Sequence, residues 1–438
     1  MSFFLKGVHT PHRKNTADKP AVRMTDVKSV TIPMSMHIGA PAKPLVKVGD
    51  VVAVGDKIAE GGGFVSVPMH ASVSGKVTKI IDVRLSSGAK CPAIVIESDG
   101  EMRVSEAVAP PVVTNRDELL AAIRESGVVG LGGAGFPTHV KFNVDPSRIE
   151  ELIINGAECE PYITSDSYTM ANRTADIERG LRAMQEHFGI GRIIIGIENN
   201  KKPAIAAMRE MAARMSGVEV SVLPAKYPQG GEKVLVYHTT KKVIPTGKLP
   251  IDVGCVVCNC TTIAAIGGYL DTGMPLVKKC VTVDGGAVST PQNVIVPLGT
   301  SLEDVFTFCG GFKEAPAKVL YGGPMMGVTV IDLSAPILKN TNAILALTEK
   351  EARLPKTTAC IRCGACINTC PFGLAPASIE RAYKKKDTEA LKQLSVDTCM
   401  LCGCCSFVCP ANRPLVQTNS LAKVHLREER AKEAAKNG

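Results

Sequence analysis

The sequence predicts an α/β protein of several domains, and three observations lead to this prediction. The chain has 438 residues, about three times the length of a typical single domain. Between residues 150 and 224, continuous apolar strands alternate with amphipathic helices, which is typical of a parallel, doubly wound sheet. Nine of the 16 cysteines lie between Cys360 and Cys409, so the C-terminal part has a chemistry of its own.

The N-terminal segment, residues 1–110, has the pattern of a small all-β module. Residues 28–100 contain short strands separated by turns, and the stretches VKVGDVVAVGDKIAE and SVSGKV resemble the barrel-sandwich hybrid fold of lipoyl and biotinyl carrier domains. Those carriers modify a lysine at a hairpin tip, whereas the corresponding stretch here, residues 61–64, reads GGGF. We therefore expect a structural or docking module.

Residues 111–250 are predicted to form the α/β core, after a linker marked by Pro110 and Pro111. Thr114 and Asn115 can cap a helix that reaches about Ser126, with acidic residues in its first turn where the helix dipole favours them. The alternation then continues through the strand IEELIIN, a helix over 167–188, the strand RIIIGIE, a helix over 203–215 and the strand VEVSVLP.

Three further segments complete the predicted organisation. Residues 251–343 combine a connecting segment with a small α+β module over 275–327, in which two strands precede a helix capped at Ser301. Residues 344–420 are expected to be helical between the cysteine motifs. The charged stretch 421–438 is most simply a solvated helix, with docking as the alternative.

Composition and charge exclude several classes of protein. The content of 45% apolar and 21% charged residues excludes disorder, collagen and coiled coil. The net charge of +9 is mild, and basic residues are not interleaved with aromatic ones, so nucleic acid is not an expected partner. The basic surface is either solvated or faces an acidic protein or anionic lipid. Without an apolar span or a signal-peptide pattern, we expect a chain in the reducing cytoplasm, free or peripheral to a membrane.

The clustered cysteines form two copies of C-x2-C-x2-C-x3-C-P. In such motifs three thiolates hold one [4Fe-4S] cubane and the fourth ligates the other. We therefore expect cluster 1 to use Cys360, Cys363, Cys366 and Cys409, and cluster 2 to use Cys399, Cys402, Cys405 and Cys370. Structural zinc is the competing interpretation, but its ligands usually come as two CxxC pairs. Cys404 has no place in either set.

A glycine-rich loop, VVGLGGAGFPTHVKF, contains Gly130, Gly132, Gly133 and Gly135. It satisfies G-x-G-x-x-G formally but follows a predicted helix, so it is not the dinucleotide fingerprint, which follows a strand. Four glycines in six residues still let a backbone approach a flat ring or a pyrophosphate, and Lys141 can neutralise a phosphate. A purely structural loop is the alternative.

Polar residues follow the first core strand in the stretch IINGAECEPYITSD. Asn155, Glu158 and Glu160 lie where ligands of open α/β sheets bind, beyond the carboxyl ends of strands. Solvated loop carboxylates are the alternative. A flavin would also connect nicotinamide, which transfers two electrons as hydride, with cubanes, which accept one electron at a time.

Taken together, GLGGAGFPTHVKF, NGAECEPYITSD, the start FFLKGVHTPHRKNT and the paired cysteine motifs resemble the RnfC family, which belongs to the Rnf complexes, the ferredoxin:NAD oxidoreductases of bacterial membranes. The core is also similar to the NADH-binding flavin subunit of respiratory complex I. The resemblance implies non-covalent FMN, an NAD(H) site, a β-grasp (SLBB) module near residues 275–327 and a helical two-cluster ferredoxin-like domain.

The resemblance also implies roles for particular residues. The glycine loop and Lys141 would contact the phosphates of FMN and NADH, and Asn155 would contact the flavin ring. Glu158 and Glu160 would lie near the flavin and the nicotinamide, where they would adjust the flavin potential and orient the nicotinamide. The remaining matches are Gly132, Gly133 and Gly135 in that loop, Gly231 and Glu232 as a nucleotide contact, and Asn259 and Thr261 as a flavin-phosphate stretch. Ala157 and the sequence CNC depart from the complex I relative. Cys255, Cys258 and Cys260 are expected to be buried thiols.

The expected function is a peripheral electron-transfer subunit at the cytoplasmic face of the membrane. The resemblance implies partners that include membrane-embedded subunits, which would translocate ions, and a ferredoxin-accepting iron-sulfur subunit. One alternative is the flavin-containing cobalamin reductase of microcompartments, which is expected to begin with the core rather than with a barrel-sandwich module. Another is a non-catalytic ferredoxin-like scaffold.

Overall fold

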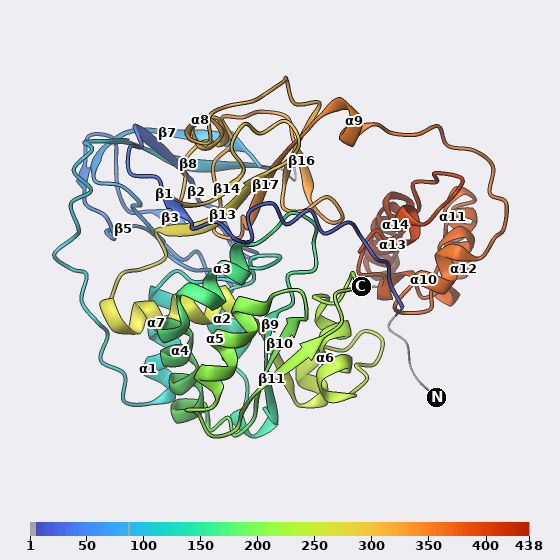
Figure 1. Cartoon of the computed structure of the whole chain (residues 1–438), viewed down its shortest axis with the longest axis horizontal. Coiled ribbons are helices and arrows are strands. Elements are labelled where there is room, and N and C mark those ends of the chain that lie inside the picture. The colour runs from blue at the N-terminus through green and yellow to red at the C-terminus, as the bar shows by residue number, and fades with distance from the viewer. Residues whose placement is uncertain (1–5, 86–87, 438) are drawn as a thin grey trace.

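A computed structural model describes residues 6–85 and 88–437 (Figure 1). Three modules pack into one body, and a helical C-terminal unit lies beside it at the end of an extended connection. Residues 1–5, which open the stretch that contributed to the resemblance, lie outside the described residues. Among the helices of the described part, none combines the length and the apolar character needed to cross a membrane.

The N-terminal module consists of two small antiparallel sheets. Their strands enclose alternating buried side chains such as Val30 and Ile32, as expected for a sheet with one face on a core. The four-stranded sheet has the order β2-β8-β7-β4 and the other the order β3-β5-β6. The strands are β2 (Ser29–Pro33), β3 (Lys43–Pro44), β4 (Val51–Val52), β5 (Lys57–Glu60), β6 (Met69–His70), β7 (Gly75–Arg84) and β8 (Lys90–Ser98).

The central module is a four-stranded sheet of order β11-β10-β9-β12, and every pairing in it is parallel. Helix α6 covers one face by burying Leu235 and Val236, whereas α4 and α7 cover the other, so the doubly wound prediction is confirmed. The strands are β9 (Glu151–Gly156), β10 (Ile193–Glu198), β11 (Val218–Leu223) and β12 (Cys255–Asn259). The helices are α1 (Arg116–Glu125), α2 (Thr138–Phe142), η1 (Pro146–Arg148), α3 (Ser165–Asn172), α4 (Thr174–Phe188), α5 (Lys202–Ala212), α6 (Glu232–Thr240), η2 (Pro250–Val253) and α7 (Cys260–Thr272).

Local predictions in this module hold with two differences. Asn115 caps α1 by accepting a hydrogen bond from the Glu118 amide, as expected. The helix predicted over 167–188 is instead two helices, because Arg173 leaves the helical conformation (φ −122°, ψ 36°). The second difference concerns the domain boundary that we predicted after residue 250. Strand β12 lies beyond this boundary, yet it completes the central sheet by pairing with β9.

Two glycines let α4 and α7 cross closely. A Cβ added to Gly180 would lie 2.6 Å from the Ile263 carbonyl oxygen, and one added to Gly267 would lie 1.9 Å from that of Asp176. Only a hydrogen atom fits at these points, so the two backbones approach each other and the start of α7 is brought beside the glycine-rich loop.

The third module is a mixed six-stranded sheet of order β1-β14-β13-β17-β15-β16. Residue 344, where we expected a helical segment to begin, lies in β17, so that prediction is wrong. The run AILAL is fully buried between β13 and β15, and a short apolar run cannot be assigned to helix or strand from periodicity. The elements are β1 (Val22–Arg23), β13 (Lys278–Asp284), β14 (Gln292–Pro297), α8 (Leu302–Phe308), β15 (Lys318–Tyr321), β16 (Val328–Val330), β17 (Ala343–Leu347) and α9 (Glu349–Ala352).

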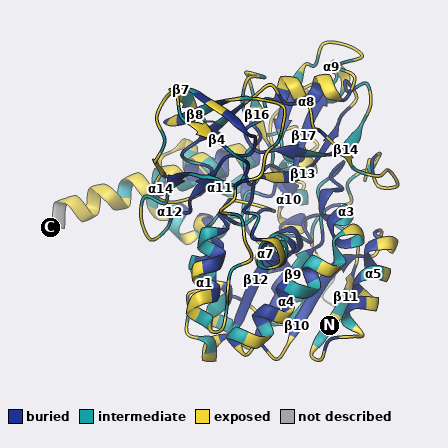
Figure 2. Cartoon of the chain, turned by 90° about the vertical axis from the view of Figure 1, so that its left-hand side faces the viewer, coloured by how far each residue is buried: buried dark blue, intermediate teal, exposed yellow. Residues whose placement is uncertain are grey.

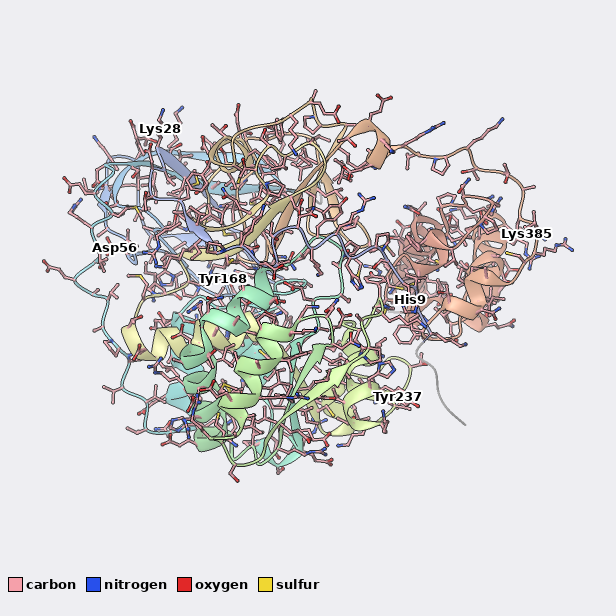
Figure 3. All side chains as sticks on the ribbon, in the orientation of Figure 1. His9, Lys28, Asp56, Tyr168, Tyr237 and Lys385 are labelled. Atoms are coloured by element: carbon pink, nitrogen blue, oxygen red, sulfur yellow. The ribbon has the colours of Figure 1, made fainter. Side chains whose placement is uncertain are left out.

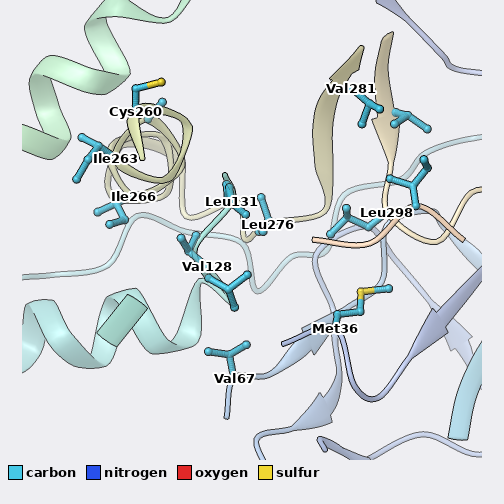
Figure 4. Packing of buried hydrophobic residues seen from close by; sticks show 14 of the residues in the cluster. Met36, Val67, Val128, Leu131, Cys260, Ile263, Ile266, Leu276, Val281 and Leu298 are labelled. Atoms are coloured by element: carbon cyan, nitrogen blue, oxygen red, sulfur yellow. The ribbon is translucent and has the colours of Figure 1, made fainter. Parts of the chain in front are cut away.

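These three modules share one hydrophobic core. Figure 4 shows Leu131 of the glycine-rich loop between Ile263 of α7 and Leu276, with Met36 of the N-terminal module nearby, and all of these residues belong to one buried cluster. Because a close-packed interior transmits displacements, the position of the loop depends on all three modules.

The C-terminal unit is helical and has a small core of its own around Ile379, Leu391 and Leu426. The tail is not an independent helix from residue 421, because α14 begins at Leu415 and buries Ala422 and Leu426; beyond them it extends into solvent (Figure 2). The helices are α10 (Ala365–Thr369), α11 (Pro376–Lys384), α12 (Thr388–Gln393), η3 (Val396–Thr398), α13 (Cys404–Phe407) and α14 (Leu415–Asn437).

Candidate functional site

The glycine-rich loop lies between α1 and α2 and is held by groups of the N-terminal module and of the third module. The carbonyl oxygen of Leu131 accepts a hydrogen bond from Lys279 Nζ (2.6 Å), that of Gly133 from Asn340 Nδ2 (2.9 Å), and that of Gly135 from the Ile38 amide (3.1 Å). Three alternate carbonyls are thus bonded to the protein, which restrains the conformation of the loop.

The glycines of this loop differ in what surrounds them. A Cβ added to Gly132 would lie 2.4 Å from Asn259 Nδ2, so this glycine is needed for the contact between the loop and the start of α7. A Cβ added to Gly133 would have nothing within 4 Å, so this glycine borders open space. The backbone at Gly132 and Gly133, which we call the glycine cradle, leaves room for a flat ring to lie against the main chain.

Asn259 and Thr261 form a hydrogen-bonded group with Asp166 at the start of α7. Asn259 caps the helix by accepting from the Thr261 amide (2.9 Å), and its Nδ2 donates to Asp166 Oδ2 (2.8 Å). Thr261 Oγ1 donates to the other carboxylate oxygen (2.7 Å). Asp166 was not among the residues predicted from the sequence. The signal that could have found it is an acidic residue in the first turn of a helix, here α3.

Asn155, at the end of β9, is brought to the loop that precedes α6. Its Nδ2 donates to the Gly230 carbonyl (2.9 Å), and its Oδ1 accepts from the Ala157 amide (3.2 Å). At the other end of this region Lys141 donates to the Val257 carbonyl (2.8 Å) and pairs with Glu232 across 3.6 Å. The structure therefore gathers the predicted flavin and nucleotide residues at the carboxyl edge of the parallel sheet.

Glu158 follows β9 in a left-handed backbone conformation (φ +47°), which is uncommon for a residue with a side chain. Its Oε1 accepts from the Asp166 amide at the start of α3 (2.7 Å), whereas its buried Oε2 has no hydrogen-bond partner among the described residues. Burial raises the pKa of Glu158 to about 7, against the opposing charge of Lys14. Folded proteins leave few buried polar atoms without a partner, so this oxygen marks Glu158 as a candidate functional residue.

Glu160 is committed to a contact that the sequence did not reveal. Its two carboxylate oxygens accept from the amides of Met325 (3.0 Å) and Met326 (2.8 Å), in the loop between β15 and β16. The carboxylate thus joins the central module to the third one. Burial raises the pKa of Glu160 to about 7, although the two amides oppose the shift.

Glu160 should make the chain less stable as the pH rises. Between the ordinary pKa of 4.5 and the raised value of about 7, the folded chain binds a proton that the unfolded chain does not. Its contribution to the free energy of unfolding is therefore fully present below about pH 4.5 and lost as the pH rises through about 7. We expect the fall in melting temperature from about pH 5.5 to about pH 8.5 to be smaller in Glu160→Gln than in the wild type. Exposed Glu186→Gln should keep the wild-type slope, and an unchanged slope in Glu160→Gln would contradict the assignment.

A buried ion pair at the end of β10 was also missed. Glu198 and Lys201 are separated by 3.0 Å, and their side chains are only 3% and 5% exposed. Buried charges of this kind are retained when paired. The sequence signal for this pair is that the apolar strand RIIIGIE ends with the polar residues Glu-Asn-Asn-Lys. These residues lie at the same edge of the sheet as Asn155.

Five of the clustered cysteines line one small cavity in the C-terminal unit. Cys370, Cys399, Cys402 and Cys405 lie around it, together with Cys404, Pro371 and Leu374 among others. Cys370 therefore lies with the cysteines of the second motif rather than with those that precede it in its own. No three His, Cys, Asp or Glu side chains of the described residues converge tightly enough to hold a single metal ion.

The segment before Cys360 pairs with the segment after Cys409. The Thr358 amide donates to the Ala411 carbonyl (3.0 Å), and Arg413 donates to the Thr358 carbonyl (2.9 Å). The chain just before Cys360 therefore runs beside the chain just after Cys409. Cys366 packs in one small cluster with Cys409 and with Cys405 of the second motif.

Tyr227 joins the C-terminal unit to the central module. Its hydroxyl donates to the Cys402 carbonyl (2.7 Å), and its own carbonyl faces Cys404 Sγ at 4.0 Å. Cys404 is 1% exposed and packs in this contact, with Cys159 and Met400 beside it. The thiols of Cys255, Cys258 and Cys260 are buried, as expected.

A parallel α/β core with a glycine cradle, joined to a helical unit with two cysteine sets, defines a flavin and iron-sulfur electron-transfer protein. Family models match along the chain: the RnfC barrel-sandwich hybrid domain over residues 2–101, the Nuo51 FMN-binding domain over 123–268, the SLBB domain over 280–329 and the 4Fe-4S dicluster domain over 356–432. These matches confirm the predicted fold class and the FMN and 4Fe-4S cofactors, and the dicluster model decides against zinc.

The relatives are RnfC proteins of ion-translocating oxidoreductase complexes. The chain is 41% identical to the one from the Na(+)-translocating ferredoxin:NAD(+) oxidoreductase of Acetobacterium woodii, covering 86% of each chain. It is 42% identical to that of the proton-translocating complex of Clostridium ljungdahlii, covering 86% of this chain and 83% of the relative. For the Rhodobacter capsulatus protein the identity is 38%, over 98% and 85%. The chain belongs to this family, the RnfC proteins of the ion-translocating ferredoxin:NAD+ oxidoreductases, and is thus one member of an assembly of several subunits.

A solved structure shows the same fold at low identity. The NAD+-reducing [NiFe]-hydrogenase in its H2-reduced state matches with a TM-score of 0.50 and 17% identity, over 71% of this chain and 61% of that one. At that identity the likeness concerns the fold alone.

Proposed function

We propose that this protein passes electrons between NAD(H) and a partner through the residues gathered at the sheet edge and the two cysteine sets. The observation that carries the proposal is the contact at Tyr227, which places the loop of Cys402 directly against the loop that Asn155 touches. A short path of this kind is what electron exchange between a flavin site and an iron-sulfur site requires.

The FMN site is proposed to consist of the glycine cradle, Asn155 and the start of α7. Gly132, Gly133 and Gly135 would face the ligand, with Asn259 and Thr261 at the helix N-terminus, where an anionic phosphate is favoured. FMN, when bound, supplies the exchange between the two-electron chemistry of NAD(H) and the one-electron chemistry of clusters. Lys141, Glu232 and Gly231 would face the nucleotide, and Glu158 and Glu160 would lie beside the flavin and the nicotinamide, where they would tune the flavin potential and orient the nicotinamide.

The cluster ligands are proposed to be crossed between the motifs. The cavity lined by Cys370, Cys399, Cys402 and Cys405 supports cluster 2. The pairing of the chain before Cys360 with the chain after Cys409 supports cluster 1, formed by Cys360, Cys363, Cys366 and Cys409. Because crossed ligands hold two cubanes close together, the unit would conduct single electrons.

The order of the electron path follows from where the two cysteine sets lie. Cys402 contacts Tyr227 of the central module, whereas Cys360 and Cys363 are exposed, as is Ile361 between them at 68%. Cluster 2 is therefore proposed to exchange electrons with the flavin site, and cluster 1 with the partner. We propose that this partner is the ferredoxin-accepting iron-sulfur subunit, and that membrane-embedded subunits hold the chain at the cytoplasmic face and translocate the ions.

The proposal is tested on anaerobically purified protein with three measurements on one sample. We expect about one extractable FMN per chain, about eight irons, and reduction of ferricyanide by NADH. A sample with intact clusters and no FMN would support the non-catalytic scaffold instead. A sample with FMN and clusters that does not oxidise NADH would remove the proposed activity.

A further inference from the structure

The first described residues cross the molecule as an extended strap. This N-terminal strap, residues 6–19, runs from the C-terminal unit over the central module to the third module (Figure 1), and Figure 3 shows His9 beside the C-terminal unit. Thr369 donates to the Gly7 carbonyl (2.8 Å), and the Val8 amide donates to the Tyr227 carbonyl (2.8 Å). Further on, Asn15 donates to Asp284 (3.1 Å).

Lys14 is the point at which the strap meets the acidic loop, residues 158–163. Its ammonium group donates to three carbonyl oxygens of that loop, those of Glu158 (2.9 Å), Glu160 (2.9 Å) and Ile163 (2.5 Å). An ammonium group has three protons, so all of them are used on one short stretch of backbone. Within the described residues Lys14 is in no ion pair, although the charges of Glu158 and Glu198 lie near it.

The acidic loop needs such a clamp because its backbone is strained. Glu158 (φ +47°) and Tyr162 (φ +70°) both occupy the left-handed region, which side chains disfavour. A strained loop persists only when surrounding contacts determine it, and here three carbonyl oxygens point at a single lysine. The strap also supplies the His12 carbonyl to the Tyr162 amide (3.0 Å).

We propose that Lys14 is a positioning residue for NAD(H): by fixing three carbonyls it holds Glu158 and Glu160 in the conformation that the nucleotide site requires. This inference rests on the proposed function, since it assigns a role within the same site. Without the clamp the loop samples other conformations, and the binding energy of NADH is partly spent on ordering it again. The loss therefore falls on KM more than on kcat.

The experiment compares Lys14→Met with Lys19→Met in the full-length protein loaded with FMN and both clusters. Lys19 is a matched control, because it lies on the same strap and donates to one exposed carbonyl of the third module, that of Pro291 (2.9 Å). We expect Lys14→Met to raise the KM for NADH by about tenfold in ferricyanide reduction and to change kcat by less than about threefold. Hydrogen exchange should accelerate at the amides of 158–160 and 162–164, with FMN and iron content unchanged.

Lys14→Arg keeps the charge and several donors, so its KM should return to within about threefold of the wild type. If Lys14→Met does not fold, Lys14→Gln against Lys14→Arg gives the same comparison. A wild-type KM in Lys14→Met or Lys14→Gln, or an equal rise in Lys19→Met, would overturn the inference while leaving the proposed function intact. A wild type that carries FMN but does not oxidise NADH would overturn both.

Discussion

Replacing Cys409 with alanine should remove the cluster of the other motif, that of Cys360, Cys363 and Cys366, and leave the cluster of its own motif in place. The reason is geometric: the chain after Cys409 is paired with the chain before Cys360, while Cys370 lines the cavity of Cys399, Cys402 and Cys405. Iron content should fall by about half. Electron transfer to the physiological partner should be lost, because cluster 1 is the proposed exit, while reduction of cluster 2 by NADH should persist.

The matched variant is Cys370→Ala, which should remove the cluster of Cys399, Cys402 and Cys405. Electron paramagnetic resonance of the NADH-reduced and dithionite-reduced samples distinguishes the two clusters. In Cys370→Ala the flavin site should lose its acceptor, so that the remaining cluster is reduced by dithionite but only slowly by NADH. Loss of the second-motif cluster in Cys409→Ala would refute both the crossed ligands and the proposed order.

Replacing Gly133 with leucine should give a chain that folds and carries both clusters but does not retain FMN. A Cβ at this position meets nothing within 4 Å in the ligand-free protein, so a larger side chain is tolerated by the fold itself. The same side chain fills the cradle that the flavin is proposed to occupy. We expect FMN affinity to fall roughly 10- to 100-fold or more, as overfilling a packed site does, and NADH oxidation to fall with it. Fluorescence titration of FMN into the flavin-free protein measures the change.

Gly130→Ala is the control within the same loop. A Cβ there would lie 3.7 Å from the Phe136 backbone, which is ordinary contact, and Gly130 is outside the left-handed region. This variant should bind FMN as the wild type does. Gly132→Ala should differ from both, since its Cβ collides with Asn259 and would disturb the fold of the loop even without flavin. Full FMN retention by Gly133→Leu would place the flavin elsewhere.

Much of the fold and cofactor content could be predicted because the relevant signals are local. Spacing within each cysteine motif reports its cluster type, and apolar strands between amphipathic helices report a parallel sheet with both faces covered. The end of a strand marks the ligand edge, which is where Asn155 lies. Predictions failed where local signals are ambiguous, as in the buried run 343–347, or where one residue breaks a helix, as Arg173 does.

The sequence by itself determined the modules, their order and the residue types that face a flavin and two clusters, because each depends on neighbours along the chain. Only the tertiary structure decided which groups meet across modules. Lys14 and Glu160 are each more than 140 residues from their partners, and Lys279 reaches the glycine loop from another sheet. Their donors and acceptors are common to many lysines and glutamates, and only the packing of three modules around one core brings them to the site.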